Sequence, residues 1–484
     1  MHALFTYGSG VPRYLGLWLI LTPVLVAGLL AFGVRRGAVL AVALSTLPSL
    51  TRNPPQWLGP GLQYGMMAVL LVFIGVWLVA RVRAGRATEP DVAPAPVAVP
   101  WRKVVALAAL ALALRVPLAW WDPGISQIGT STELADRQLL AGHNPYTRPN
   151  RFADAGTYQY PAGTLLLHAP AVALVPKTVA GEEHVGVRLV LWLTDIAAVV
   201  FLVWAGARAG AARAGLAAAF AYAVGPTLVR ESGLTVSNDL VLALLVAGAA
   251  MALTRRRLML TGVLVGLAVA IKPSAVLLLP LLVVVAGAGP TLVAVAVPAV
   301  LQAPFFLWPS VGLHHMERLL EPATRRETLS VLRISSMWWP LYKTVGNTSS
   351  AIRVAAAIGV AVSALASFWA GRELRRRGVT LSTATAAFAL PLLVAYALAA
   401  VQRTNYQDWY LTSFLLCAGL TAVRVPKPVP VEAPALEPVL EPVLEPVLVP
   451  AAPVPRAVWR DGMPAPAPPA IWAPSRDPNP AGRA

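Results

Sequence analysis

Lys272 is the most unusual charge in this sequence, because it interrupts two apolar runs at 258–271 and 274–288. A cation in such a place is costly unless it faces water, a charged partner or an anionic ligand. Together with Pro273 it predicts a break between two short helices. Two interpretations stay open: the ammonium binds an anionic group, or the lysine only extends its side chain to the interface with water.

Two further pairs of polar residues stand beside apolar runs. Asn238 and Asp239 begin a helix after a turn, and the simplest expectation is that they cap its free N–H groups. His314 and His315 lie in a long polar loop with several arginines. Adjacent residues point apart on a helix, and no carboxylate–histidine spacing completes a metal site, so no metal is predicted.

The elements that position these residues are helices in a membrane. Apolar residues make up 57% of the 484 residues and charged residues only 13%, with a mean hydropathy of +0.65. Runs such as 15–32 and 187–205 are long enough to cross a hydrocarbon layer of about 30 Å. The single cysteine, Cys417, excludes an internal disulfide and a cysteine metal site. An all-α, multi-pass integral membrane protein is therefore predicted.

Thirteen apolar runs indicate helices. They fall near 15–34, 37–50, 65–80, 104–121, 187–206, 214–230, 239–254, 258–271, 274–288, 290–308, 351–371, 382–401 and 409–424. A further apolar stretch, 162–176, is interrupted by prolines. If it does not span, the basic loops all fall on one side, which the positive-inside rule assigns to the cytoplasm. We therefore interpret 162–176 as an interfacial or re-entrant helix.

The net charge of +17 follows from these short basic loops. No zinc spacing or recognition-helix pattern accompanies the arginines, so no nucleic-acid partner is predicted. The favoured topology places the long polar loops 122–161 and 309–350 together on the extracytoplasmic face. The short turns at 231–238, 272–273 and 402–408 are expected on the same face.

Two segments are of low complexity. Residues 87–100 read as a flexible linker, and the segment after 424 contains three Leu-Glu-Pro-Val repeats amid abundant proline. Proline removes the hydrogen-bond donors that helices and sheets need, so a disordered, cytoplasmic tail is expected. The predicted organisation is three N-terminal transmembrane helices (1–86), the linker (87–100), a helical membrane module (101–424) and the tail (425–484).

The first long loop contains an expected surface helix. Residues 132–141 have helical periodicity, with Leu134, Ala135, Leu139 and Leu140 arranged for one apolar face. Gly142 should end this helix, and the segment Asn144-Pro145-Tyr146 should form a turn.

This loop carries a family resemblance. An amphipathic helix followed by "GHNPY", "YQYPAG" and an apolar stretch ending in proline resembles the first external loop of the GT-C glycosyltransferases. The segments "GLTVSNDLVLALLVAGAAMA" (233–252), "LTGVLVGLAVAIKPSAVLLLP" (260–280) and "NYQDWYLTSFLL" (405–416) are similar to the same superfamily. The nearest resemblance is to bacterial polyprenyl-phosphomannose-dependent mannosyltransferases, family 87-like, over about 100–424.

The resemblance implies transfer of a sugar, such as mannose or another hexose or pentose, from a polyprenyl phosphate to an extracytoplasmic glycan or glycolipid in the cell envelope. A carboxylate must take the acceptor proton. The family places an Asp shortly before the amphipathic helix, but residues 125–132 contain no carboxylate. Asp122 is the first choice, and Glu133 and Asp136 are alternates. Asp122 could equally be an ordinary solvated carboxylate, and loss of catalysis stays open.

The resemblance also implies binding roles. Lys272 and Arg403 would neutralise the donor phosphate. Asn238 and Asp239 could hydrogen-bond a sugar, Tyr146 and Tyr160 could stack on it, and His314 and His315 could contact acceptor or phosphate. No cofactor besides the lipid-linked donor is implied.

Two alternative functions stay open. A transporter or flippase of lipid-linked sugar would place charges at the bilayer midplane and show internal repeats, and neither pattern is evident. A non-catalytic relative is the other alternative.

Overall fold

The computed structural model describes residues 15–45, 60–84, 95–121, 127–151, 157–158, 160–175, 184–308, 349–399 and 408–422. These residues form helices, turns and loops. Contacts divide the chain into two units, Met1–Val425 and Pro426–Ala484. The predicted tail lies outside the described residues.

Four helices precede the first long loop: α1 (Leu15–Ala31), α2 (Arg36–Ser45), α3 (Pro60–Ala84) and α4 (Trp101–Trp121). The first three pack directly on later helices, α1 on α8, α2 on α19 and α3 on α18. At the end of the predicted linker, the Val97 N–H donates to the Ala207 carbonyl at 3.0 Å.

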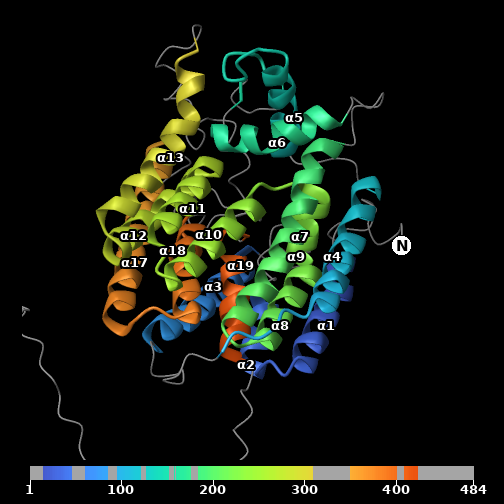
Figure 1. The fold of residues 1–484 in the computed structure, drawn as a ribbon, viewed down its shortest axis with the longest axis vertical. Helices are drawn as coiled ribbons and strands as arrows, with labels where there is room; N and C mark the ends of the chain where they lie inside the picture. Colours follow the sequence, from blue (N-terminus) through green and yellow to red (C-terminus); the bar gives the residue numbers. More distant parts are fainter. Residues whose placement is uncertain are drawn as a thin grey trace, which may run out of the picture. The chain divides into compact units, whose positions relative to one another are not determined.

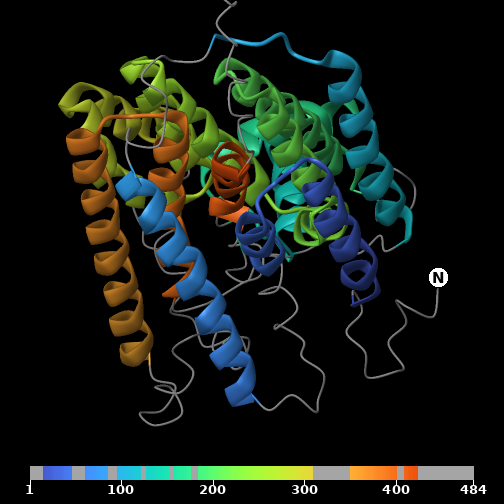
Figure 2. The same cartoon turned by 90° about the horizontal axis from the view of Figure 1, so that it is seen from below.

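The remaining helices complete the bundle. They are α5 (Gln127–Leu140), α6 (Ala162–Leu174), α7 (Val185–Arg208), α8 (Ala212–Val224), α9 (Pro226–Arg230), the π-helix η4 (Glu231–Thr235), α10 (Asp239–Thr254), α11 (Leu258–Ile271), the 3-10 helix η5 (Pro273–Leu278), α12 (Leu279–Ala286), α13 (Ala288–Phe306), α17 (Ser349–Arg377), α18 (Leu381–Ala397) and α19 (Asp408–Ala422). Where the structure describes the thirteen apolar runs, they are mostly helical, because a helix satisfies its own backbone groups in an apolar medium. The α19 helix lies inside the bundle, against α8, α10 and α18 (Figure 2).

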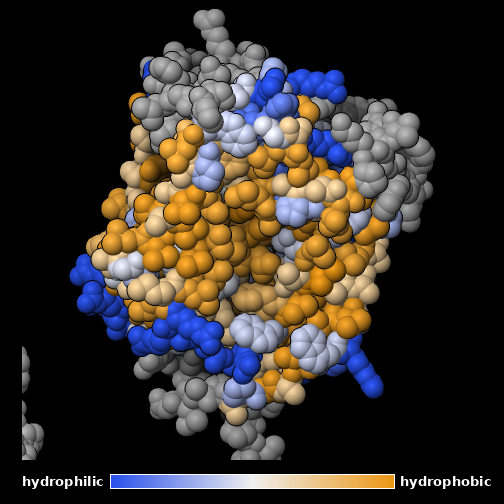
Figure 3. Space-filling model, turned by 45° about the horizontal axis from the view of Figure 1, so that its top comes forward, coloured by the Kyte–Doolittle hydropathy of each residue, from blue (hydrophilic) through white to orange (hydrophobic). Residues whose placement is uncertain are grey.

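The length and composition of three helices suit a membrane span: Val185–Arg208, Ala288–Phe306 and Arg353–Arg377. A fourth span is formed if α8 and the α9–η4 segment are counted together across their 49° bend. Several shorter apolar helices accompany them. Figure 3 shows a broad apolar face with hydrophilic side chains toward its two ends. The predicted fold class, all-α and membrane-integral, is confirmed.

Arginine-rich helix ends lie at one end of the bundle. We call this end, defined by Arg213, Arg255 and Arg377, the basic end. Arg213 donates to the Ala31 carbonyl at 3.4 Å, and Arg377 donates to the carbonyl of Arg83. Likewise Arg255 donates to the Arg208 carbonyl at 3.2 Å. These contacts join three pairs of helix ends: α1 with α8, α3 with α17, and α7 with α10. The basic loops therefore share one end of the bundle, as the sequence predicted.

The helices α5 and α6 lie at the opposite end of the bundle (Figure 1). We call this end the loop end. The α6 helix has 13 residues, which gives a length of about 20 Å at 1.5 Å per residue. It lies against the end of α11, where Thr164 donates to the Ile271 carbonyl at 3.0 Å. A single helix of this length is too short for a layer of about 30 Å, but α8 and α11 are about as short, so the interfacial interpretation of α6 stays a prediction.

Small residues let two helices approach closely. A Cβ on Gly262 would lie 2.2 Å from the Pro290 carbonyl oxygen, and one on Gly266 would lie 2.8 Å from Val297 Cβ. Both contacts join α11 to α13. This spacing of glycines is typical of tight helix packing in membranes, and it keeps α11, with Lys272 at its end, in a fixed place.

Candidate functional site

The described residues contain seven of the residues predicted to act in catalysis or binding. They are Glu133, Asp136, Tyr146, Tyr160, Asn238, Asp239 and Lys272. The other four, Asp122, Arg403, His314 and His315, lie outside the described residues. The described ones fall into two groups, both at the loop end. The first surrounds the starts of α10 and α19, and the second surrounds α5.

Lys272 and Asp239 form an ion pair. The Lys272 Nζ lies 2.5 Å from Asp239 Oδ1, with the lysine side chain 13% exposed and the aspartate fully buried. The pair joins the C-terminus of α11 to the N-terminus of α10. Lys272 therefore has a buried charged partner, and it does not simply extend toward water.

The expected cap of α10 by Asn238 or Asp239 is wrong. Asn238 stands at the N-cap position with helical backbone angles, φ −64° and ψ −9°, and its side chain makes no capping hydrogen bond. Instead, Ser237 Oγ accepts from the Asp239 N–H at 3.3 Å and donates to Asp239 Oδ2 at 2.7 Å. Because Asp239 is held by Ser237 and Lys272, its carboxylate serves the ion pair.

A strained turn lies immediately before this pair. Arg230 ends α9 and its Nη1 lies 3.1 Å from Glu231 Oε1, the first residue of η4. One residue after η4, Val236 has φ +54°, a left-handed conformation that β-branched residues rarely adopt. π-Helical turns and strained residues are both enriched at functional sites. The turn 231–239 is thus the first structural candidate for the site.

Asp408 adds a carboxyl group at the start of α19. Its side chain is fully buried, and neither oxygen has a hydrogen-bond partner among the described residues. The charges that act on it are those of Glu231, Asp239, Arg230 and Lys272. In this group Arg230 pairs with Glu231 and Lys272 pairs with Asp239. The Asp408 carboxyl is the fifth charged group and has no cation paired with it among the described residues. We call these five residues the charged cluster.

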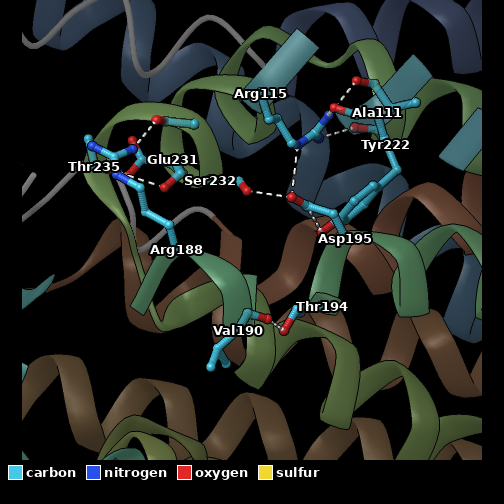
Figure 4. Close-up of polar contacts among 12 residues, drawn as sticks. Ala111, Arg115, Arg188, Val190, Thr194, Asp195, Tyr222, Glu231, Ser232 and Thr235 are labelled. Atoms are coloured by element: carbon cyan, nitrogen blue, oxygen red, sulfur yellow. Dashed lines mark hydrogen bonds and ion pairs between the residues drawn. The ribbon is translucent and has the colours of Figure 1, made fainter. Parts of the chain in front are cut away.

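A second buried network holds the charged cluster in place (Figure 4). Arg115 of α4 pairs with Asp195 of α7 at 3.1 Å, both fully buried. The other Asp195 oxygen accepts from the Tyr222 hydroxyl at 2.9 Å, and the Ser232 hydroxyl donates to the paired one. Through Ser232, the network fixes η4 and with it the neighbouring Glu231.

Backbone contacts complete this network. Arg115 donates to the carbonyls of Ala111, Ala223 and Tyr222 at 3.0, 2.8 and 2.9 Å. Arg188 donates to the Gly233 carbonyl in η4 at 2.6 Å. The bonds to Tyr222, Ala223 and Gly233 occupy carbonyls at the bend after α8 and in the π-helix, where regular partners are lacking. The network is structural, and it determines where the charged cluster lies.

The second group centres on Glu133 of α5. Arg137 Nε and Nη2 donate to Glu133 Oε1 at 3.0 and 2.5 Å, and the other carboxylate oxygen contacts His184 Nδ1. Burial alone would raise the pKa of Glu133, but the His184 and Arg137 hydrogen bonds and charges lower it overall. Glu133 is therefore a carboxylate at neutral pH.

Asp136 has the opposite environment, although it lies on the same helix. It is fully buried, and neither of its oxygens has a partner among the described residues. Burial raises the pKa of Asp136 to about 9, with the Glu133 charge adding to the rise and Arg137 opposing it. A protonated Asp136 cannot accept a proton, so it does not suit the role of general base.

The predicted apolar face of α5 is only partly correct. Ala135 is buried, whereas Leu140 is 51% exposed and Leu134 is half-buried. The helix ends as predicted: Gly142 has φ +75°, and the His143 N–H donates to the Gln138 carbonyl at 2.9 Å. The polar side of α5 is turned inward, which places its acidic residues in the protein.

Aromatic packing fixes the loop between α5 and α6. The Tyr146 hydroxyl donates to the Tyr160 carbonyl at 2.7 Å, and the Tyr146 ring packs on Tyr158 and Phe305, with centroids 5.6 and 5.5 Å away. Asn144 forms the expected turn, accepting from the Tyr146 N–H at 3.0 Å. Tyr146 is 1% exposed, so in this conformation its ring serves packing and is closed to a sugar.

Several residues of the site escaped sequence reasoning. Arg115 and Asp195 interrupt apolar runs just as Lys272 does, and that was the signal available for them. Asp408 lies inside a motif used for the resemblance. Glu231 and His184 had no local signal, because their partners come from other helices. Among the described residues, no group of three or more metal-ligating side chains is assembled.

The fold and the site define the class of protein. Membrane-length apolar helices with a charged site at one end are the architecture of a polytopic membrane protein. One comparison bears on its activity: the sequence model of glycosyltransferase family 87 matches residues 158–396, just under half of the chain. Over these residues the chain is similar to that family, which supports a glycosyltransferase with membrane helices. Among curated proteins and solved structures no match was found.

Proposed function

We propose that the protein transfers a sugar from a polyprenyl-phosphate donor to a glycan or glycolipid acceptor on the extracytoplasmic side of the cell membrane. The observation that supports this best is the charged cluster at the loop end of an otherwise apolar bundle. A lipid phosphate presents an anionic head group at the boundary of the bilayer. Lys272, 13% exposed, lies where such a head group would approach.

The leaving phosphate needs cations, because negative charge grows on it as the sugar departs. In this proposal the Lys272 ammonium exchanges its Asp239 contact for the phosphate, and Asp239 then accepts from sugar hydroxyls. Arg403, seven residues after Tyr396, is proposed as a second cation. Asp122 stays a proposed carboxylate of the site, together with Glu133.

A flippase of lipid-linked sugar is the second candidate. Charges inside the spans, such as Arg115 and Asp195, would be expected of a transport path. Both side chains are fully buried and bonded to protein groups, which favours a structural role for them. A flippase moves a labelled donor across vesicles without an acceptor, whereas a transferase forms a new glycoside, and this difference separates the two.

The test uses purified protein in vesicles with a radiolabelled polyprenyl-phosphate sugar. Lys272→Met should raise the apparent donor constant about tenfold to a hundredfold, because a charge-assisted phosphate contact contributes ~1.5–3 kcal/mol. Asp239→Asn removes the ion pair but keeps the ammonium and an amide oxygen that still accepts from a sugar hydroxyl, so the donor constant should rise much less than in Lys272→Met. Arg255→Gln, at the basic end, is the control. Equal losses in Lys272→Met and Asp239→Asn would mean that the pair is only structural.

Orientation is tested separately. In a Cys417→Ser background, a single cysteine at 140 should react with an impermeant thiol reagent in intact cells, and one at 256 should not. The reverse pattern would place the loop end in the cytoplasm and would contradict an extracytoplasmic reaction.

A further inference from the structure

The contact between Glu133 and His184 joins two elements that are distant in sequence. Glu133 lies on α5, and His184 is the residue directly before α7. One Glu133 oxygen contacts His184 Nδ1, while the other is held by Arg137. The imidazole does not cap its own helix. The side chains of Glu133 and His184 are 11% and 13% exposed, so the pair can be reached from the loop end.

The charge state of Glu133 determines the tautomer of His184. Because its partners keep Glu133 ionised, the carboxylate can only accept a hydrogen bond. In a neutral imidazole the proton must then be on Nδ1, which leaves a lone pair on Nε2. No contact to Nε2 is found among the described residues. A carboxylate that fixes an imidazole in this way is the arrangement by which histidine acts as a general base.

Hydrogen bonds connect the start of α7, where His184 lies, to η4, which carries Glu231 of the charged cluster. His184 has φ +46°, in the left-handed region, which is uncommon and costs energy unless the surroundings enforce it. Its carbonyl accepts from the Arg188 N–H at 3.1 Å, one helical turn along α7. Arg188 in turn donates to Gly233 in η4 at 2.6 Å, two residues from Glu231. The backbone at His184 and the turn that carries Glu231 are therefore connected through Arg188.

We propose that His184, oriented by Glu133 and Arg137, is the general base of the sugar transfer. This inference rests on the proposed function and names a catalytic residue for it. Nε2 takes the proton of the acceptor hydroxyl as its oxygen bonds to the anomeric carbon. The bond from that carbon to the phosphate oxygen breaks, and the phosphate leaves with the electron pair. Glu133 stabilises the imidazolium that results, which then loses its proton to water.

Charged groups on α5, α7 and η4, where α5 and η4 both pack on α7, bear on how the reaction depends on pH. From α5 these are Glu133, Arg137 and the buried Asp136, and α7 contributes Arg188. From η4 the charged residue is Glu231. The remaining histidine nearby, His168 of α6, is buried with Nδ1 2.8 Å from the Thr164 carbonyl. A protonated imidazole cannot accept a proton, so the transfer rate should fall toward acidic pH.

The experiment measures kcat and the donor constant between pH 5 and 9 for the reconstituted full chain. His184→Asn suits the left-handed backbone and should lower kcat by roughly 10²- to 10⁴-fold, remove the acidic fall in rate and leave the donor constant within about twofold. Glu133→Gln should retain part of the rate, with the acidic fall moved to lower pH. His143→Asn changes an exposed histidine three residues after the end of α5; it is the matched control and should behave as the wild type.

Three outcomes would overturn the proposal. If His184→Asn keeps the acidic fall in rate, the base is another group, and loss of that fall in Asp122→Asn would identify it. If Glu133→Gln does not move the profile, the carboxylate does not orient the imidazole. If the wild type forms no glycoside from any polyprenyl-phosphate sugar, the proposed function itself fails. Melting curves of each variant exclude unfolding as the cause of a loss.

Discussion

Replacing Asp136 with Asn should stabilise the protein at neutral pH and change its stability little near pH 4. The folded-state pKa of about 9 lies far above the ordinary value of 3.8. Between these values the unfolded chain has an ionised carboxylate, whereas the folded protein keeps the proton. The sign follows: the contribution of Asp136 to the free energy of unfolding is highest below pH 4 and falls as pH rises toward 9.

The magnitude follows from the same two values. Each pH unit in this window lowers the free energy of unfolding by ~1.4 kcal/mol. From pH 4 to pH 7 the contribution reaches about 4 kcal/mol as an upper bound. Asn has nearly the same size and does not titrate, so the difference between Asp136→Asn and the wild type should grow across this range. Any constant cost of a buried amide cancels in the slope.

The assay is thermal unfolding in detergent, followed by tryptophan fluorescence at several pH values from 5 to 8.5. Glu133→Gln is the matched control from the same helix. Its pKa is lowered in the folded protein, so its stabilisation is present at neutral pH and lost on acidification, the opposite sign. Parallel curves for Asp136→Asn and the wild type would refute the reasoning, because they would show Asp136 ionised in the folded state.

Two further predictions concern packing inside the bundle. Arg115→Met leaves Asp195 buried without its cation and should lower the free energy of unfolding by about 3–5 kcal/mol, whereas Arg115→Met/Asp195→Leu should recover most of it; denaturant titration compares them, and equal losses would contradict a buried pair. Gly262→Ala places a Cβ 2.2 Å from a backbone oxygen and should cost about 1–3 kcal/mol. Gly37→Ala, with open space around it, should not destabilise α2.

The sequence predicts the helices well because the signal for each is contained in its own segment. An apolar run of membrane length has few structures available to it, and the basic loops indicate which ends lie together. The interfacial character of 162–176 also follows from the sequence, since proline interruptions and loop charges both oppose a span. The helix end at Gly142 and the turn at Asn144 could also be predicted from the residues at these positions.

The site was harder to predict because its contacts join distant segments. Asp239 was expected to cap α10, since an Asp at a helix start usually does, but Lys272 lies 33 residues later and outcompetes the backbone. His184 had no feature in its own segment, and its role depends on Glu133, 51 residues away. The buried side of α5 was misjudged because polar residues on a helix normally face water, whereas here Glu133 meets His184 and Thr132 meets Tyr158, both from later segments.

The short length of α6 also has a consequence for biosynthesis. A membrane chain is threaded helix by helix, and each crossing reverses the direction of the next one. In the topology proposed here α6 does not cross, so that α4 and α7 would be consecutive crossings of opposite direction. Lengthening α6 by about a turn and a half, and replacing Pro170, would make it long enough to cross. Every later helix would then be inverted, and the arginines at 208, 255–257 and 377 would have to be carried through the bilayer. The length of α6 would thus determine the membrane orientation of all later helices.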